Sequence, residues 1–219
     1  MPTDEGDGYT TMNLLLHVGC GHKTRALTTR GFSARNWHEL RLDLDPSVKP
    51  DLIGSLTDLS MVADASIDGI YSSHNIEHLY PHEVPIALAE FRRVLKPRGL
   101  AVITCPDLRS ICKLVADDYL EEAAYQSISG PIAPIDVLYG HRASLAQGNL
   151  FMAHRTGFTQ KTLTADLHAA GFPRVAGMTR STSPFFDIWV LALKSDATNA
   201  EMTRLVSEHF PPQTTALNA

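Results

Sequence analysis

Residues 91–107, FRRVLKPRGLAVITCPD, join the end of one regular element to the start of the next. The apolar residues that lead into this stretch recur every three or four positions: Val84, Ala87, Leu88, Phe91 and Leu95. That spacing predicts an amphipathic helix over about residues 83–96, which Pro97 and Gly99 end. The run LAVITC, residues 100–105, then predicts a buried strand. A helix that passes directly into a buried strand is half of the repeating unit of an α/β fold.

The same two patterns recur on both sides of this unit. Further strands are predicted at residues 14–18, 39–44, 51–54 and 67–73, with a closing pair at 172–179 and 185–194, and further helices at 159–170 and 200–209. Strands that alternate with helices indicate a mainly parallel sheet covered on both faces. Residues 45–50 are too few for the crossover that normally joins parallel strands. Either a helix is missing there or the neighbouring strand predictions are shifted.

Length and composition predict one domain. The chain has 219 residues, of which 44% are hydrophobic and 20% charged, and this favours a single domain over residues 1–219. Residues 1–12 are expected to be a flexible leader and residues 211–219 a flexible tail. Residues 108–158 interrupt the alternation, and residues 127–148 are rich in Gly, Pro and Ser. We therefore predict a helical and loop cap inserted after the fifth strand.

Charge and cysteine usage exclude several classes of protein. The net charge is -5, and with no Lys or Arg run longer than two residues a nucleic-acid partner is not expected. Three cysteines without a CxxC pair favour a reducing, cytoplasmic compartment over a disulfide framework or a structural zinc site. The N-terminal sequence MPTDEGDGYTTMN is polar, and no apolar run approaches the about 18 residues of a membrane span. No membrane partner is expected either, and a homodimer remains open.

Two polar features follow the first two predicted strands. Val18-Gly19-Cys20-Gly21 comes directly after the first strand, and small residues in such a turn let backbone N–H groups approach a ligand. Asp43 lies near the end of the second strand, where a carboxylate can accept both hydroxyls of a ribose. Taken alone, each feature is equally explained by an ordinary turn or a cap residue.

The order of features along the chain is more informative. The glycine turn, the acid, Gly54-Ser55-Leu56, SIDGIYSSHNIEHL at 66–79 and finally 91–107 together resemble the class I methyltransferases that use S-adenosylmethionine (SAM). The resemblance is to small bacterial members of the type 11-like group. It covers about residues 14–107, with a weaker similarity over 152–172. It implies a Rossmann-like sheet, SAM as cofactor with S-adenosylhomocysteine (SAH) as product, and methylation of oxygen or nitrogen on a small polar acceptor such as a carboxylate or sugar.

The resemblance also implies a set of cofactor-binding residues: His17, Gly19, Cys20, Gly21, Asp43, Leu44, Ser55, Leu56, Ser73 and His74. In this assignment the glycines lie against the methionine and ribose of SAM, Asp43 binds the ribose, and Ser55 and Leu56 border the adenine. Ser73 and His74 lie beside the transferable methyl group. The sequence departs from the family at His17, where an acid or Asn is usual, and at Lys23, where a third glycine is usual.

A hydroxyl or amine acceptor gains from a general base, and histidine has a suitable pKa. The candidates are His78, His154 and His74. Residues predicted to touch the acceptor are Tyr80, Tyr139, His141, Arg142 and Arg155. Packing or a surface position is the alternative role for each of them. Glu77 is expected to accept hydrogen bonds from backbone N–H groups or to orient a neighbouring histidine.

One motif supports a rival function. His74-Asn75-Ile76-Glu77-His78 matches H-x-x-E-H, in which two histidines on one helix face bind zinc in a hydrolase. The motif follows a predicted strand directly, which places His74 off the helix, and no distant glutamate is recognisable as a further ligand. We therefore expect no metal site. A third possibility is a non-catalytic SAM-binding protein, which the departure at His17 keeps open.

Overall fold

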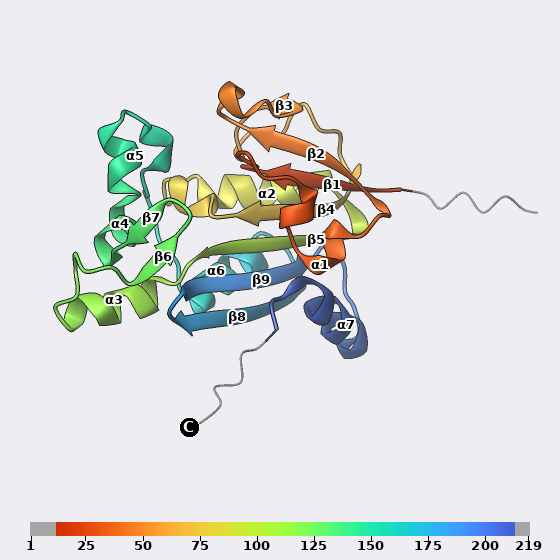
Figure 1. The fold of residues 1–219 in the computed structure, drawn as a ribbon. Coiled ribbons are helices and arrows are strands. Elements are labelled where there is room, and N and C mark those ends of the chain that lie inside the picture. The colour runs from red at the N-terminus through yellow and green to blue at the C-terminus, as the bar shows by residue number, and fades with distance from the viewer. Residues whose placement is uncertain (1–11, 213–219) are drawn as a thin grey trace, which may run out of the picture.

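A computed structural model describes residues 12–212, and its centre is one seven-stranded sheet (Figure 1). The strand order is β3-β2-β1-β4-β5-β9-β8. The strands are β1 (Asn13–Val18), β2 (Trp37–Asp43), β3 (Leu52–Ile53), β4 (Ile67–Ser73), β5 (Leu95–Pro106), β8 (Arg174–Thr182) and β9 (Phe185–Leu193). Strands β1 to β5 are parallel, and β9 pairs antiparallel with both β5 and β8. This arrangement confirms the predicted Rossmann-like α/β fold with a closing antiparallel strand.

Helices cover both faces of the sheet. Helices α2 (Val84–Val94) and α6 (Gln160–Ala169) lie behind the sheet in Figure 1, and α1 (Arg30–Ser33) and α7 (Asn199–His209) lie in front. The sheet has an apolar core on each face, because successive side chains of β1 point to opposite faces. Leu16 and Val18 belong to the core on one face, and Leu15 belongs to the core on the other. Residues Met202 and Leu205 of α7 join the cluster of Leu15 and Phe32. The C-terminal helix therefore covers the face that the short segment after β1 leaves open.

The connection between β2 and β3 contains no α-helix within residues 44–51. The predicted strands are in place, because Leu42 pairs with Leu52 and Asp43 with Ile53 in parallel register. A single 3₁₀ turn, Pro46–Val48 (η2), makes the link, and the side chain of Asp45 accepts a 2.8 Å hydrogen bond from Ser47 N. The strands are therefore not shifted, and the crossover helix that usually joins two parallel strands is absent from residues 44–51.

The helices flanking β5 largely follow the sequence prediction. Helix α2 ends earlier than predicted, at Val94, because β5 begins at Leu95 and includes the turn residues Pro97 and Gly99. Helix α6 begins after Thr159, whose side chain accepts from Thr162 N, and Gly171 with φ +90° follows its end. The predicted strand at 172–179 is displaced to β8, Arg174–Thr182.

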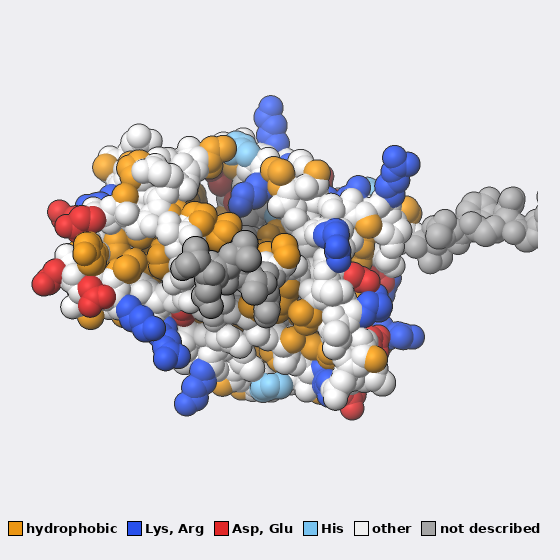
Figure 2. Space-filling model, turned by 60° about the horizontal axis from the view of Figure 1, so that its bottom comes forward, with side chains coloured by type: hydrophobic (Ala, Val, Ile, Leu, Met, Phe, Trp, Pro, Cys, Tyr) orange, Lys and Arg blue, Asp and Glu red, His pale blue; other side chains and the backbone are white. Residues whose placement is uncertain are grey.

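Residues between β5 and α6 form a separate lobe at one end of the sheet, which we call the cap (Figure 1). It contains α3 (Leu108–Ala116), β6 (Tyr125–Ser127), β7 (Gly130–Ile132), α4 (Pro134–Tyr139), α5 (Arg142–Ala146) and the 3₁₀ turn η4 (Leu150–Met152). Its two ends meet, since Leu108 N donates to Phe158 O at 2.9 Å. Its own core is small and consists of the buried residues Ile111, Ile132 and Val137. Figure 2 shows hydrophobic and acidic side chains exposed side by side on the cap, at the left of that view.

Two expectations remain as they were. The flexible leader and tail fall almost entirely on residues 1–11 and 213–219, which lie outside the described part of the chain.

None of the helices within residues 12–212 combines the length and hydropathy that a membrane crossing requires.

Candidate functional site

The glycine turn and the strand-end acid contact each other. Gly19 and Gly21 have φ values of +58° and +52°, so the chain turns sharply after β1. Gly21 N donates a 2.8 Å hydrogen bond to Asp43 Oδ2, and Asp45 N donates a 2.9 Å hydrogen bond to Asp43 Oδ1. The carboxylate therefore fixes the turn at the carboxyl ends of β1 and β2, where ligands of open α/β sheets bind.

This edge of the sheet holds a cavity of about 220 Å³, which we call the cofactor cavity. From the predicted cofactor set, Gly19, Asp43, Leu44, Ser55 and Leu56 line it. The lining residues that this set did not include are Leu42, Gly54, Asn75, His78, Leu79, Glu83, Phe151 and Arg155. Asn75 follows the end of β4, so the position after a parallel strand was an available signal. Phe151 lies in the cap, where no pattern pointed to it.

The residues present fit a ribose-bearing cofactor. Each oxygen of Asp43 accepts one backbone hydrogen bond, whereas a carboxylate offers about four acceptor positions, so capacity for two hydroxyls remains. A Cβ on Gly21 would meet no heavy atom of the described residues within 4 Å, so the turn is open to a ligand there. A Cβ on Gly19 would lie 1.8 Å from Asn75 Oδ1, so a side chain is excluded at this position.

His17 lies away from the cofactor cavity. Its side chain is 2% exposed, its Nδ1 is 2.7 Å from Glu39 Oε1, and its ring packs 5.3 Å from the ring of Tyr71. Burial lowers the pKa of His17, although the carboxylate of Glu39 acts in the opposite direction. The residue that replaces the usual acid of the family thus forms a buried pair with Glu39 on the α7 face of the sheet.

Four other members of the predicted cofactor set do not line the cavity: Gly21, Cys20, Ser73 and His74. Cys20 is 1% exposed, and burial raises the pKa of its thiol to about 11, which makes it a packing residue. Ser73 Oγ accepts a 2.9 Å hydrogen bond from Thr104 Oγ1. His74 has φ +56° and a side chain that is 47% exposed, and it follows the last residue of β4.

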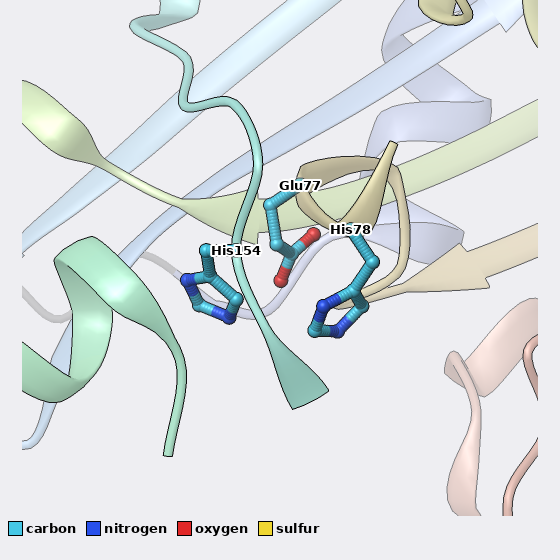
Figure 3. A group of neighbouring side chains, drawn as sticks. All are labelled: Glu77, His78 and His154. Carbon is cyan, nitrogen blue, oxygen red and sulfur yellow. The ribbon is translucent and has the colours of Figure 1, made fainter. Parts of the chain in front are cut away.

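The segment after β4 contributes a buried group of titratable side chains. Glu77 and His78 belong to a single 3₁₀ turn, Ile76–His78 (η3), and His154 approaches from the cap (Figure 3). One ligand-type atom from each of the three residues lies within 4.8 Å of the others. Glu77 is 2% exposed, and within the described residues neither oxygen of its carboxylate has a hydrogen-bond partner. We call Glu77, His78 and His154 the junction cluster.

Both histidines of the junction cluster are anchored to backbone carbonyls. His78 Nδ1 lies 3.0 Å from Ala153 O, and His154 Nδ1 lies 2.7 Å from Val137 O. A carbonyl only accepts, so Nδ1 of each ring carries the hydrogen and Nε2 keeps a lone pair. Burial lowers the pKa of His154. Burial alone would raise the pKa of Glu77, but the nearby His74, His78 and His154 lower it overall.

Of the two alternative roles expected for Glu77, the contact with His74 fits the orientation of a histidine, and the bonds from backbone N–H groups are not found among the described residues. The carboxylate of Glu77 accepts no hydrogen bond from a backbone N–H of residues 12–212. The backbone carbonyl oxygen of Glu77 does accept two, from Arg155 N at 2.9 Å and from Thr156 N at 3.2 Å. The reason is that the short turn η3 buries the side chain toward the histidines. His74 Nδ1 is 3.5 Å from Glu77 Oε1.

A second cavity, of about 280 Å³, lies between the cap and the sheet, and we call it the cap cavity. Its polar lining includes Glu77, Tyr139, His154 and Arg155. Arg155 lines both cavities, and His78 lines the cofactor cavity. Arg155 Nη1 donates a 2.9 Å hydrogen bond to His78 O, and its guanidinium lies 4.9 Å from the centre of the Tyr80 ring. The junction cluster and Arg155 therefore lie at the boundary between the two cavities.

Two of the predicted acceptor contacts have structural partners instead. His141 Nδ1 is 2.8 Å from Ser144 Oγ. Arg142 Nε donates a 2.8 Å hydrogen bond to the buried Asp136, whose carboxylate also accepts from Ala133 N. These contacts hold the cap together, and neither His141 nor Arg142 lines either cavity.

The rival zinc motif does not form the helix that a zinc hydrolase requires. His74 precedes η3, as the sequence predicted, so His74 and His78 do not share one helix face. The residue that joins Glu77 and His78 is His154, which the motif does not contain.

Comparisons with known proteins agree with this fold. Residues 16–103 match a family of methyltransferase domains, and a comparison with curated proteins gave no match. A SAM-dependent methyltransferase from Mesorhizobium loti is 17% identical with a TM-score of 0.56, and the match covers 84% of this chain and 92% of that one. A SAM-dependent methyltransferase from Methanosarcina mazei is 17% identical with a TM-score of 0.55, and the match covers 85% of this chain and 94% of that one.

A third similar structure contains both ligands of its reaction. It is the 1,6-didemethyltoxoflavin-N1-methyltransferase of Burkholderia thailandensis, solved with 1,6-didemethyltoxoflavin and SAH. It is 16% identical with a TM-score of 0.54, and the match covers 84% of this chain and 72% of that one. At these identities the likeness to the solved structures is one of fold.

The family match, the sheet order and the carboxylate at the glycine turn agree with one another. The match spans β1 to β5, which carry the glycine turn, Asp43 and the segment after β4. Residues 16–103 therefore form a SAM-dependent methyltransferase domain, with SAM as its cofactor.

Proposed function

We propose that this methyltransferase modifies oxygen or nitrogen on a small polar acceptor, such as a sugar or a carboxylate, held in the cap cavity. The observation that carries the proposal is the shared wall. Glu77 and His154 face the cap cavity, His78 faces the cofactor cavity, and Arg155 lines both. An acceptor in the cap cavity is therefore next to the site of the cofactor, as a direct transfer requires.

The residues at the wall supply what the acceptor side of the reaction needs. SAM supplies an electrophilic methyl group on a sulfonium, so the protein need not activate that group. An acceptor that gains a methyl group at a hydroxyl or amine loses one proton. His154 offers the Nε2 lone pair next to the cap cavity, with His78 and the more exposed His74 as further acceptors of that proton. Arg155 and Tyr139, which both line the cap cavity, supply a cation and an aromatic surface for the acceptor.

The test separates cofactor binding from turnover. Calorimetry with SAM and SAH measures the affinity of wild-type protein, and SAH release over a panel of sugars, hydroxy acids and amines identifies an acceptor. His154→Ala is expected to lower turnover about 100-fold with unchanged SAH affinity, which is the usual contribution of a positioned proton acceptor. The control is Ile128→Ser, because Ile128 is fully exposed on the cap and lines neither cavity. Unchanged turnover of His154→Ala on every acceptor would refute this placement.

We also propose a reducing, cytoplasmic location. Cys20, Cys105 and Cys112 are free thiols, and Cys112 is exposed. An exposed free thiol is typical of proteins that remain in a reducing compartment. Fractionation of cells that produce the tagged chain tests the location, and recovery outside the cytoplasm would contradict it.

A further inference from the structure

The junction cluster contains a buried carboxylate without a hydrogen-bond partner among the described residues. Glu77 is 2% exposed, and none of the residues 12–212 donates a hydrogen bond to either of its carboxylate oxygens. An unpaired buried carboxylate is strongly unfavourable, and native structures normally satisfy such a group with donors or with a metal ion. The nearest cation-forming groups are histidines, and His74 is 3.5 Å away.

The two histidines are held as metal ligands usually are. Each donates Nδ1–H to a backbone carbonyl of the cap, His78 to Ala153 at 3.0 Å and His154 to Val137 at 2.7 Å. Such a bond fixes the tautomer with the lone pair on Nε2 and fixes the plane of the ring, which is the usual outer contact of metal-binding histidines.

The separations permit one ion among the three side chains. One ligand-type atom from each residue lies within 4.8 Å of the others (Figure 3). A tetrahedral ion with bonds of about 2.0–2.1 Å needs ligand atoms about 3.4 Å apart, so side-chain shifts of about 1 Å complete the site.

We infer that Glu77, His78 and His154 bind one divalent first-row transition metal ion, with zinc as the reference case. Two imidazoles and one carboxylate, with a further position free for substrate, are the ligand set of catalytic zinc sites. Magnesium prefers an all-oxygen shell and is not expected to compete. The free position faces the cap cavity, because Glu77 and His154 line that cavity.

The role of the ion rests on the proposed function. An acceptor hydroxyl that coordinates the ion loses its proton to water more easily, since a bound cation lowers the pKa of its oxygen ligands. The oxygen lone pair then forms the bond to the methyl carbon, and the electrons of the broken S–C bond remain on sulfur, which gives SAH. In this form of the site the histidines are ligands, and water replaces His154 as the proton acceptor. The inferred acceptor is thus a hydroxyl compound whose oxygen binds a metal ion.

The experiment measures metal binding without SAM or acceptor. Full-length protein is stripped with a chelator and titrated by calorimetry with Zn²⁺ and, separately, Mg²⁺. We expect one Zn²⁺ per chain and at least tenfold weaker binding for Glu77→Gln and for His154→Ala. His38→Ala is the matched control, because His38 is an exposed histidine outside both cavities. Absence of zinc binding by wild-type protein, or equal binding by Glu77→Gln, would overturn the inference.

Thermal melting guards against variants that simply fail to fold. In metal-free buffer Glu77→Gln is expected to keep a cooperative melting transition, which shows that the variant folds. Added Zn²⁺ is expected to raise the Tm of wild type and of His38→Ala but not of Glu77→Gln. A rise in the Tm of Glu77→Gln on adding Zn²⁺ that equals the rise of wild type would contradict the inferred site.

The two proposals can fail separately. If wild-type protein binds SAM and methylates an acceptor at full rate after chelation, the metal has no role in the reaction and this inference fails while the proposed function stands. If zinc binds as expected but no acceptor is methylated, the proposed function fails and the metal site stands.

Discussion

The cofactor cavity and the cap cavity are built in different ways. The first rests on backbone geometry at strand ends, where Gly19 and Gly21 turn the chain and Asp43 holds the turn. The second depends on side chains that the cap brings to the sheet, with His154 and Arg155 beside Glu77. A site made from strand ends can bind a common cofactor in many proteins, whereas a site made from an inserted lobe decides which acceptor is used.

Substitution of Gly19 is the most severe test of the cofactor cavity. Gly19→Ala places a Cβ 1.8 Å from Asn75 Oδ1 at a backbone φ of +58°. The αL strain and the clash together are expected to destabilise the protein by about 4 kcal/mol and to abolish SAM binding. Urea denaturation measures the loss, and adding Asn75→Ala should recover the part due to the clash. A wild-type Cm for Gly19→Ala would contradict this geometry.

One contribution to acid stability lies outside both cavities. His209 is 3% exposed on α7, its Nδ1 lies 2.7 Å from Thr29 Oγ1, and burial lowers its pKa to about 4. The unfolded chain binds the proton first, so stability is complete above about pH 6.5 and falls by up to about 3 kcal/mol as the pH drops to about 4. Urea denaturation of wild type and His209→Gln across this range should give a flatter profile for the variant. Equal slopes would place the acid sensitivity elsewhere.

The carboxylate of Asp43 should act by charge and by geometry. Asp43→Ala removes the acceptor for Gly21 N and for the ribose hydroxyls, and about 30-fold weaker SAH binding is expected, which is about 2 kcal/mol. Asp43→Asn keeps one acceptor oxygen, so its affinity for SAH should lie between those of wild type and Asp43→Ala. Calorimetry gives the ranking, and an Asn variant weaker than Ala would show that Asp43 is not the ribose acceptor.

A smaller effect is expected from the internal contact of the cap. Arg142→Ala removes an ion pair with the buried Asp136, but the guanidinium is 47% exposed and backbone N–H groups still serve the carboxylate. We expect the free energy of unfolding to fall by about 1 kcal/mol. Turnover, measured as SAH produced, should fall as well, while the affinity for SAH stays unchanged. Weaker SAH binding in Arg142→Ala would mean that the two cavities are not independent.

The same division explains what could be predicted from the sequence. Val84, Leu88 and Phe91 are all buried on one face of α2, because hydrophobic periodicity reports directly which face is covered. The sequence did not decide whether a helix lies between β2 and β3. The conformation of this connection depends on Arg41, whose guanidinium donates hydrogen bonds to Lys49 O at 2.9 Å and to Gly21 O at 2.6 Å.

The candidate site was predictable only in part. Asp43 and Gly19 follow strands and could be placed by position alone. The meeting of Glu77 with His154 depends on the path of the cap, and no local pattern encodes a contact between residues so far apart in the chain. Arg142 was assigned to the acceptor by residue type, yet Asp136, six residues before it, is its partner.

The most direct test of the account measures SAH affinity and turnover in two variants at once. Calorimetry gives the Kd for SAH, and SAH release gives kcat, for wild type, Asp43→Ala and His154→Ala. We predict a crossed result, in which Asp43→Ala loses affinity and His154→Ala loses turnover at wild-type affinity. If His154→Ala loses SAH affinity as strongly as Asp43→Ala, or if neither variant differs from wild type, the cofactor and acceptor are not held in the two cavities as described.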